Sequence, residues 1–303
     1  MKCTVPFVVA WCLVATALKE SAAPLQLADL PADPACVLHV DCDALRRAYI
    51  GQYLLYQLNK PQLHSNLVAF ASFVSFDFRT QLHGLTIYGV DSSADDNVAI
   101  FYADLDTDRL TRLFKAAEAA RISTNNNHVI YSWINGGVRN FAVVESNRLV
   151  SSKSRESVIA NLGVIDGTSP DFSKSKTLPN LPAASDTALV QGVAGNLDFV
   201  TGPHAALFKL SKWATLQANE VDEHLRATLT LKLGDEETAK QAAVVVLGLI
   251  AQLSLQPDNP KAANLAGGMA VKQSGTTVTV TLAVPSLELI EALKVASAKK
   301  DNP

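Results

Sequence analysis

Two short acidic motifs hold the residues of this sequence that are best suited to chemistry. Asp104, Asp106 and Asp108 stand two positions apart, and oxygen ligands at that spacing can converge on one calcium ion. The rest of a calcium-binding loop is missing, because Arg109 occupies the position that needs glycine and Lys115 the position of the bidentate glutamate. Capping of a following helix, whose dipole favours negative charge, explains the three aspartates without a metal.

The second motif is Asp41-Cys42-Asp43, which we place where a strand ends and a helix begins. A carboxylate at such a junction could act as an acid, a base or a ligand. Catalysis by a carboxylate pair requires surroundings that separate the two pKa values, and the sequence does not show them. Capping again explains Asp41 or Asp43, so we assign no catalytic role.

Other catalytic and cofactor motifs are missing. No Gly-x-Ser-x-Gly elbow, phosphate-binding glycine loop or His-Glu-x-x-His pattern occurs, and the histidines have no metal-ligand spacing. The six are His39, His64, His83, His128, His204 and His224. We therefore predict no metal site and no cofactor. A hydrolase with an unrecognised site stays open, and a cleft with a buried carboxylate beside His39 or His83 would support it.

Composition indicates a folded protein with no affinity for nucleic acid. Hydrophobic residues make up 48% of the 303 residues and charged residues 18%, so the chain can bury a substantial core. The formal net charge is -3, with both signs interspersed, which gives no basic surface for a phosphate backbone.

The N-terminus is typical of a signal peptide, which we assign to residues 1–23. Lys2 precedes an apolar run over 5–15 that is too short to cross a bilayer, and small residues follow. Cleavage is expected after Ala17 or Ala23, and the mature chain is predicted to be periplasmic or extracellular, without a membrane span. A retained short anchor, or a lipoprotein modified at Cys12, are the alternatives.

Two cysteines remain after the predicted cleavage, Cys36 and Cys42. If they lie on one strand, six steps hold their sulfurs roughly 20 Å apart, which is too far for a disulfide. We expect two small buried residues on one strand face, and a reactive or metal-binding pair is the alternative.

Hydrophobic periodicity and turn residues divide the first half of the chain into strands and helices. We expect, in order, a strand over 35–40, a helix over 43–59, strands over 85–89 and 98–102, a helix over 108–120, a hairpin of 128–134 with 141–145, a strand over 149–153 and a helix over 154–162.

A similar order follows an irregular segment rich in Ser, Pro, Asp and Lys. It comprises a strand over 189–194, a helix over 203–214, strands over 216–221 and 225–233, a helix over 236–255, a hairpin of 269–273 with 278–284 and a helix over 286–298. Thr228, Thr230 and Lys232 alternate with leucines, which predicts a sheet with one wet face.

The repeated order predicts an α+β fold of two similar repeats, over 24–162 and 186–303, joined by a linker over 163–185. Each repeat would be a mostly antiparallel sheet with helices packed on one face, a ferredoxin-like or related arrangement. The argument depends on element order alone, and mixed α+β chains often show similar orders without duplication.

The helix over 236–255 is apolar on every side. A central position between a sheet and the other repeat would explain this. The alternative is that Val244, Leu247 and Ile250 line a groove for an apolar ligand or a partner chain.

Three short segments resemble a family of uncharacterised exported bacterial proteins. They are 30–33 (Leu-Pro-Ala-Asp), 39–45 (His-Val-Asp-Cys-Asp-Ala-Leu) and 150–155 (Val-Ser-Ser-Lys-Ser-Arg). The resemblance implies export and a shared fold, and it brings no activity. The leading hypothesis is therefore an exported, non-catalytic protein that binds another protein or a component of the cell envelope. A carrier of an apolar ligand and a hydrolase are the alternatives.

Overall fold

The computed structural model describes residues 25–57, 77, 79–89, 96–145, 147–179, 181, 188–195, 197, 205–255 and 260–300. The predicted signal peptide, His64 and His204 lie outside these residues.

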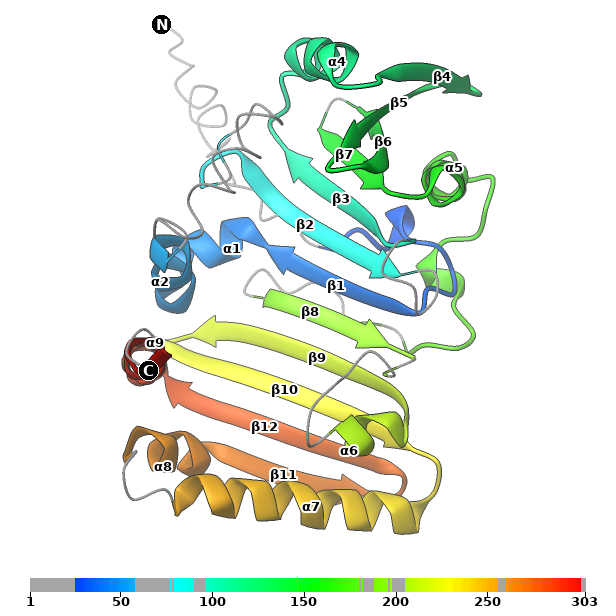
Figure 1. The fold of residues 1–303 in the computed structure, drawn as a ribbon. Helices are drawn as coiled ribbons and strands as arrows, with labels where there is room; N and C mark the ends of the chain where they lie inside the picture. The colour runs from blue at the N-terminus through cyan, green and yellow to red at the C-terminus, as the bar shows by residue number, and fades with distance from the viewer. Residues whose placement is uncertain are drawn as a thin grey trace, which may run out of the picture.

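The described residues form one antiparallel sheet of twelve strands (Figure 1). Its order is β11 (Met269–Ser274), β12 (Thr277–Pro285), β10 (His224–Leu233), β9 (Ser211–Val221), β8 (Ala188–Ala194), β1 (Cys36–Asp41), β2 (Leu82–Gly89), β3 (Val98–Ala103), β7 (Arg148–Ser152), β6 (Val138–Val144), β5 (His128–Asn135) and β4 (Arg121–Asn125).

The helices lie around this sheet (Figure 1). They are α1 (Cys42–Arg47), α2 (Tyr49–Gln57), α4 (Thr107–Ala116), α5 (Arg155–Ile165), α6 (Ala205–Lys209), α7 (Glu236–Ser254), α8 (Pro260–Gly267) and α9 (Ser286–Lys300), with 3-10 turns η1 (Leu27–Asp29) and η2 (Phe172–Lys174). None of these helices is long and apolar enough to cross a membrane.

Pairing between β1 and β8 joins the two predicted halves, with His39 opposite Gln191. The α+β class and the antiparallel pairing are confirmed. The expectation of one sheet per repeat is wrong, because backbone hydrogen bonds continue from one half into the other. The sheet order does not show a ferredoxin-like arrangement, and the duplication stays a prediction.

One face of the sheet carries an apolar residue on nearly every strand, and we call it the front face. Residues directly opposite each other in an antiparallel ladder point to the same side, so the register defines a row across all twelve strands. The row is Val271, Val280, Leu229, Leu216, Gly192, Leu38, Ile87, Ala99, Ser151, Ala142, Tyr131 and Ile122. Such a face must be covered or must leave apolar surface in contact with water.

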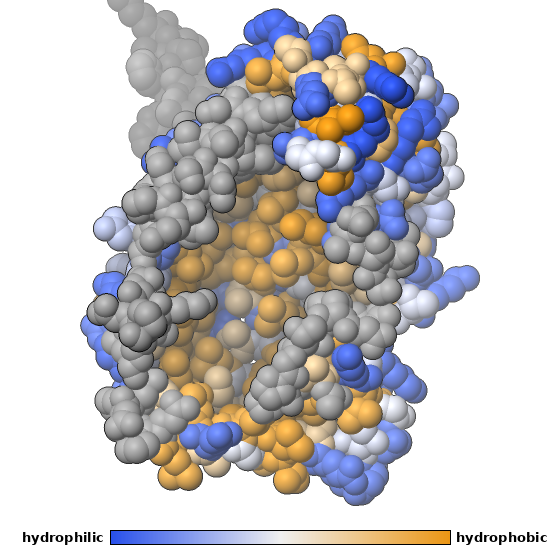
Figure 2. Space-filling view, viewed as in Figure 1, coloured by the Kyte–Doolittle hydropathy of each residue, from blue (hydrophilic) through white to orange (hydrophobic). Residues whose placement is uncertain are grey.

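Helices cover the front face at both ends of the sheet. Helix α7 packs on β10 and β12, where Leu231 and Val278 are fully buried. At the other end, Phe114 of α4 packs against Tyr131 and Trp133, with ring centroids 5.5 and 4.8 Å away. Between these ends Figure 2 shows a hollow whose interior is hydrophobic.

The back face changes character along the sheet. Over β1, β2, β3 and β8 it is covered by η1, η2 and the chain around them, which bury Leu30 and Phe172 completely. Over β9, β10 and β12 it carries partly exposed threonines such as Thr228, which confirms the predicted wet face. Phe172, Leu178 and Leu181, which lie in the segment predicted as a linker, are part of this core cluster.

Several element predictions are confirmed, among them α5, α7, α9 and the hairpins β5–β6 and β11–β12. The helix expected over 43–59 is interrupted at Ala48, whose backbone is extended, and so becomes α1 and α2. The helix expected over 203–214 ends at Lys209, because 211–214 begin β9. Strand β4 and helix α8 were not predicted.

Truncation of Phe172 tests whether this segment is core. Phe172→Ala is expected to lower the free energy of unfolding by about 3–5 kcal/mol, the usual cost of emptying a buried aromatic site. Leu255→Ala is the control, because Leu255 is 79% exposed, and a change within about 0.5 kcal/mol is expected there. Urea titration followed by circular dichroism measures both. Equal losses in the two variants would contradict the burial of Phe172.

Candidate functional site

An apolar pocket of about 290 Å³ lies between α6, α7 and the front face of the sheet. Its walls are Leu207, Phe208, Leu229, Leu231, Val246, Leu249, Ile250, Leu253, Met269 and Val280. Four of them come from α7: Leu249, Ile250 and Leu253 stand three, four and seven positions after Val246, which places all four on one side of the helix. Every wall residue is apolar, so the pocket offers no hydrogen bond from a side chain.

The front face continues from this pocket as the floor of the hollow in Figure 2. Leu229 forms part of the pocket wall and lies opposite Leu216, which is followed by Gly192 and Leu38 in the same row. Leu216 is 39% exposed and Leu38 is 42% exposed. We call these four residues and Ile87 the apolar floor. Exposed leucines in a concave, apolar surface are typical of a binding groove.

The backbone packing at the centre of the apolar floor explains why residue 192 is a glycine. A Cβ atom there would stand 3.1 Å from the carbonyl oxygen of Val37 and 3.4 Å from a methyl group of Leu38. The missing side chain therefore lets Leu38 lie across β8.

The three predicted groove residues separate in the structure. Ile250 lies in the pocket wall. Val244 and Leu247 lie on the outer side of α7, where they are 67% and 51% exposed. The sequence prediction found the helix but missed the contributions of α6 and the strands. The alternation of Leu229 and Leu231 with threonines, which predicted only a wet sheet face, is the signal that could have found the strand side of the pocket.

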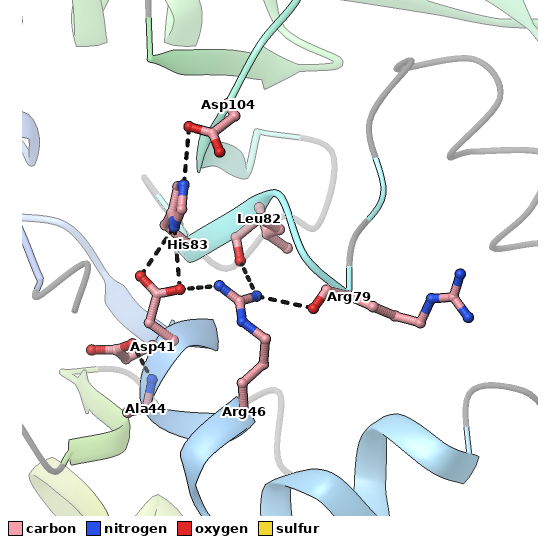
Figure 3. A network of polar contacts seen from close by, with 8 residues as sticks. Asp41, Ala44, Arg46, Arg79, Leu82, His83 and Asp104 are labelled. Carbon is pink, nitrogen blue, oxygen red and sulfur yellow. Dashed lines mark hydrogen bonds and ion pairs between the residues drawn. The ribbon is translucent and has the colours of Figure 1, made fainter. Parts of the chain in front are cut away.

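A polar cluster surrounds His83 at the start of β2 (Figure 3). Its Nδ1 is 3.1 Å from a carboxylate oxygen of Asp43, and its Nε2 is 3.2 Å from Asp104. Arg46 forms an ion pair with Asp43 and donates a hydrogen bond to the backbone oxygen of Leu82 over 2.8 Å. The cluster thus connects α1, β2 and the β3–α4 connection.

The pKa of His83 is raised above its ordinary value. Partial burial opposes this shift by disfavouring the charged ring, and hydrogen bonds to Asp104 and Asp43 outweigh the burial.

The hydrolase hypothesis named a buried carboxylate beside His83 as its supporting feature, and Asp43 is such a carboxylate. Both ring nitrogens contact carboxylates, however, so neither of them is paired with a nucleophile in this arrangement. Burial also raises the pKa of the neighbouring Cys42 thiol to about 12, so this side chain is a neutral thiol near pH 7. The geometry gives the cluster a connecting role.

The remaining predicted site residues serve the fold. Asp41 caps α1 by accepting a hydrogen bond from the Ala44 amide over 2.7 Å, and burial raises its pKa. Asp106 caps α4 in the same way, through the Arg109 amide, which confirms the capping interpretation of both acidic motifs. Cys36 is a free cysteine that begins β1.

Cys42 is also free and begins α1, so the two cysteines do not share a strand. Among the described residues, no three His, Cys, Asp or Glu side chains are grouped so as to hold a metal ion.

His39 lies in the interior, away from the front face. It is 2% exposed, and its Nδ1 is 2.8 Å from the hydroxyl of Thr86 on the next strand. Gln191, opposite it on β8, is 1% exposed, and its amide forms no hydrogen bond in the structure. His224 is exposed and contacts the backbone oxygen of Asp222.

A second charged cluster fastens the cover of the back face. Arg148 of β7 forms ion pairs with Asp29 of η1 at 2.7 Å and with Glu145 at 2.6 Å. His128 then bridges Glu145 and Asp166, at 3.2 and 2.8 Å. These contacts connect η1, strands β7 and β5, the β6–β7 turn and the C-cap of α5.

Removal of Arg148 tests the importance of this cluster. Asp29 is 8% exposed, so Arg148→Ala leaves a buried carboxylate without its cation, and we expect a loss of about 2 kcal/mol in unfolding free energy. Arg79→Ala is the matched control, because its ion pair with Asp77 is exposed and should contribute nothing measurable. Chemical denaturation at pH 7 measures both, and no difference between the variants would refute the expectation.

Comparisons with known proteins complete the description of the site. No family model matches the chain, and no curated protein does. Among solved structures, the chain is similar to three crystal forms of TP0453, a Treponema protein. With form III the TM-score is 0.49 at 10% identity, covering 91% of this chain and 99% of that chain. Forms I and IV give TM-scores of 0.47 and 0.48 at 10% and 11% identity, each covering 91% of this chain and 98% of the other.

Proposed function

We propose that this protein binds the hydrocarbon part of an apolar or amphipathic ligand in the pocket beneath α7. The observation that carries the proposal is the pocket wall itself, in which ten apolar side chains from two helices and three strands enclose about 290 Å³. A pocket lined only by apolar side chains favours a ligand segment that forms no hydrogen bonds.

The size of the pocket specifies the ligand further. It lies at the small end of ligand pockets, which span roughly 300–1,000 Å³, so it suits one hydrocarbon chain rather than a whole lipid. A polar end group would lose its hydration inside, so we place that end outside the pocket. The adjoining apolar floor, with Leu216 and Leu38 partly exposed, can hold the part of the chain that the pocket leaves out.

Chain length is the first quantity to measure. A fluorescent fatty-acid analogue serves as the probe, displaced by unlabelled fatty acids and straight-chain alcohols of increasing length. Each further CH₂ group is expected to tighten binding about fourfold, from about 0.8 kcal/mol per buried CH₂, until the apolar surface is filled. Acids and alcohols of equal length should bind alike, because their polar ends lie outside. Binding that ignores chain length would overturn the proposal.

Two substitutions on opposite sides of α7 locate the site. Ile250→Asp places a charge in the pocket wall and is expected to weaken chain binding at least tenfold, a change of about 1.4 kcal/mol. Leu247→Asp, on the exposed side of the same helix, should leave binding unchanged.

Thermal unfolding of both variants separates lost binding from lost folding. Ile250→Ala is the second pocket variant should the aspartate unfold the chain, and it should weaken binding by a smaller factor. Equal effects of the substitutions at 247 and 250 would refute this location.

The second candidate function is that of an exported protein that binds another protein of the cell envelope. Its support is the outer side of α7, where Val244 and Leu247 are more than half exposed, together with the C-cap residue Leu255, which is 79% exposed. Capture from the native envelope would test it, together with N-terminal sequencing of the mature protein for export and cleavage after Ala17 or Ala23. Leu247→Asp separates the two functions, since it should abolish partner capture and preserve chain binding.

A further inference from the structure

The two contacts of His83 impose a condition on its protonation. A carboxylate oxygen of Asp43 is 3.1 Å from Nδ1, and one of Asp104 is 3.2 Å from Nε2. An ionised carboxylate only accepts hydrogen bonds, so each ring nitrogen must carry a hydrogen to satisfy its partner. Only the imidazolium form has two N–H groups, and the arrangement therefore requires a charged histidine.

The two carboxylates differ in what remains when the ring loses a proton. Asp43 is 9% exposed and keeps the guanidinium of Arg46 as a second partner. Asp104 is 69% exposed, and its side chain can be satisfied by water. A neutral ring that keeps its Nδ1 hydrogen on the buried Asp43 turns the lone pair of Nε2 toward Asp104. The contact that is lost is therefore the one with Asp104.

We propose that His83 is a pH-dependent clasp between helix α1 and the β3–α4 connection, closed while its ring carries two hydrogens and opened at Asp104 when the ring becomes neutral. The clasp joins α1, which follows β1, to the connection that follows β3. The proposal does not depend on the identity of a ligand.

The charged groups around the ring come from each element that packs against it. Helix α1 contributes Asp43, Arg46 and the neutral thiol of Cys42, and Asp41 precedes it as the cap. The segment before β2 contributes Asp77 and Arg79, which pair with each other. The β3–α4 connection contributes Asp104 and the capping Asp106. Acidic groups predominate, which favours the charged ring.

The direction of the pH effect follows from linkage. The pKa of His83 is higher in the folded chain than in the unfolded one, in spite of its partial burial. The contribution of charged His83 to the stability of the fold is therefore fully present below the unfolded-state pKa of histidine, about 6.5. It is lost as the pH rises through the folded-state pKa. The clasp is closed under mildly acidic conditions and open under alkaline ones.

The amide of Asp104 gives a direct readout, because it donates a hydrogen bond to the Gln81 backbone oxygen over 3.0 Å. Imidazole ¹⁵N NMR of the full chain should show His83 titrating above about 6.5, the ordinary pKa of a histidine. Over the same pH range the hydrogen-exchange protection factor of the Asp104 amide should fall severalfold, after correction for the intrinsic exchange rate.

Asp104→Asn is the test variant, and Asp108→Asn is its matched control. Both remove one negative charge from exposed positions near the start of α4, and the contact with His83 belongs to Asp104. Asp104→Asn should lower the pKa of His83 and abolish the pH dependence at residue 104, whereas Asp108→Asn should preserve both. If His83 titrates at or below about 6.5, or if both variants behave alike, the clasp is refuted. Persistence of the pH dependence in His83→Gln would refute it as well.

Discussion

The structure depends on one constraint, which is that a continuous antiparallel ladder places an apolar residue from nearly every strand on the same face. Pairing of β1 with β8 at the centre makes this face span twelve strands. Each Å² of apolar surface removed from water contributes about 25 cal/mol to stability. A face of this width therefore strongly favours helices packed on it. Helices α7 and α4 cover its two ends. The described elements leave Leu38 and Leu216 at the middle partly exposed, and the pocket adjoins this uncovered part.

The back face explains why the hollow is on the front. In β9, β10 and β12 the back face carries threonines such as Thr228 and Thr230, which need no cover. Over β1, β2 and β3 it is apolar, and the chain around η1 and η2 buries it. The charges of Asp29, Arg148 and Glu145 hold this cover against β7. The front face of the central strands is thus the large apolar surface that the described residues cover only in part.

Local features of this fold were predictable from sequence, whereas contacts between distant residues were not. Alternation of Thr228 with Leu229 indicates which side of β10 is wet, and Asp41 and Asp106 stand where helix caps belong. The apolar composition of residues 236–254 was sufficient to predict helix α7. Residues 211–214 could continue a helix or begin a strand, and only pairing with β10 decides for the strand. The β1–β8 pairing joins residues about 150 positions apart, and no local pattern encodes it.

The same distinction applies to the candidate site. Ile250 was named because it lies in an apolar helix, and it lines the pocket, whereas Val244 and Leu247 in that helix face outward. Val244 is two positions and Leu247 one position from Val246 of the pocket wall, which turns them roughly 200° and 100° around the helix from it. The contacts of His83 could not be predicted from the sequence, because its partners come from the distant positions 43 and 104.

Helix α7 has consequences for both candidate functions, because it is apolar on two opposite sides. One side supplies Val246 and Ile250 to the pocket, and the other exposes Val244 and Leu247. A ligand in the pocket and a partner on the outer surface would therefore contact the same rigid element. Any displacement of α7 by a ligand changes the surface that a partner meets, and by linkage a bound partner changes the affinity for the ligand by the same factor. A helix that packs on a sheet and faces water on its other side needs only one apolar side. Core packing therefore does not explain the exposed Val244 and Leu247.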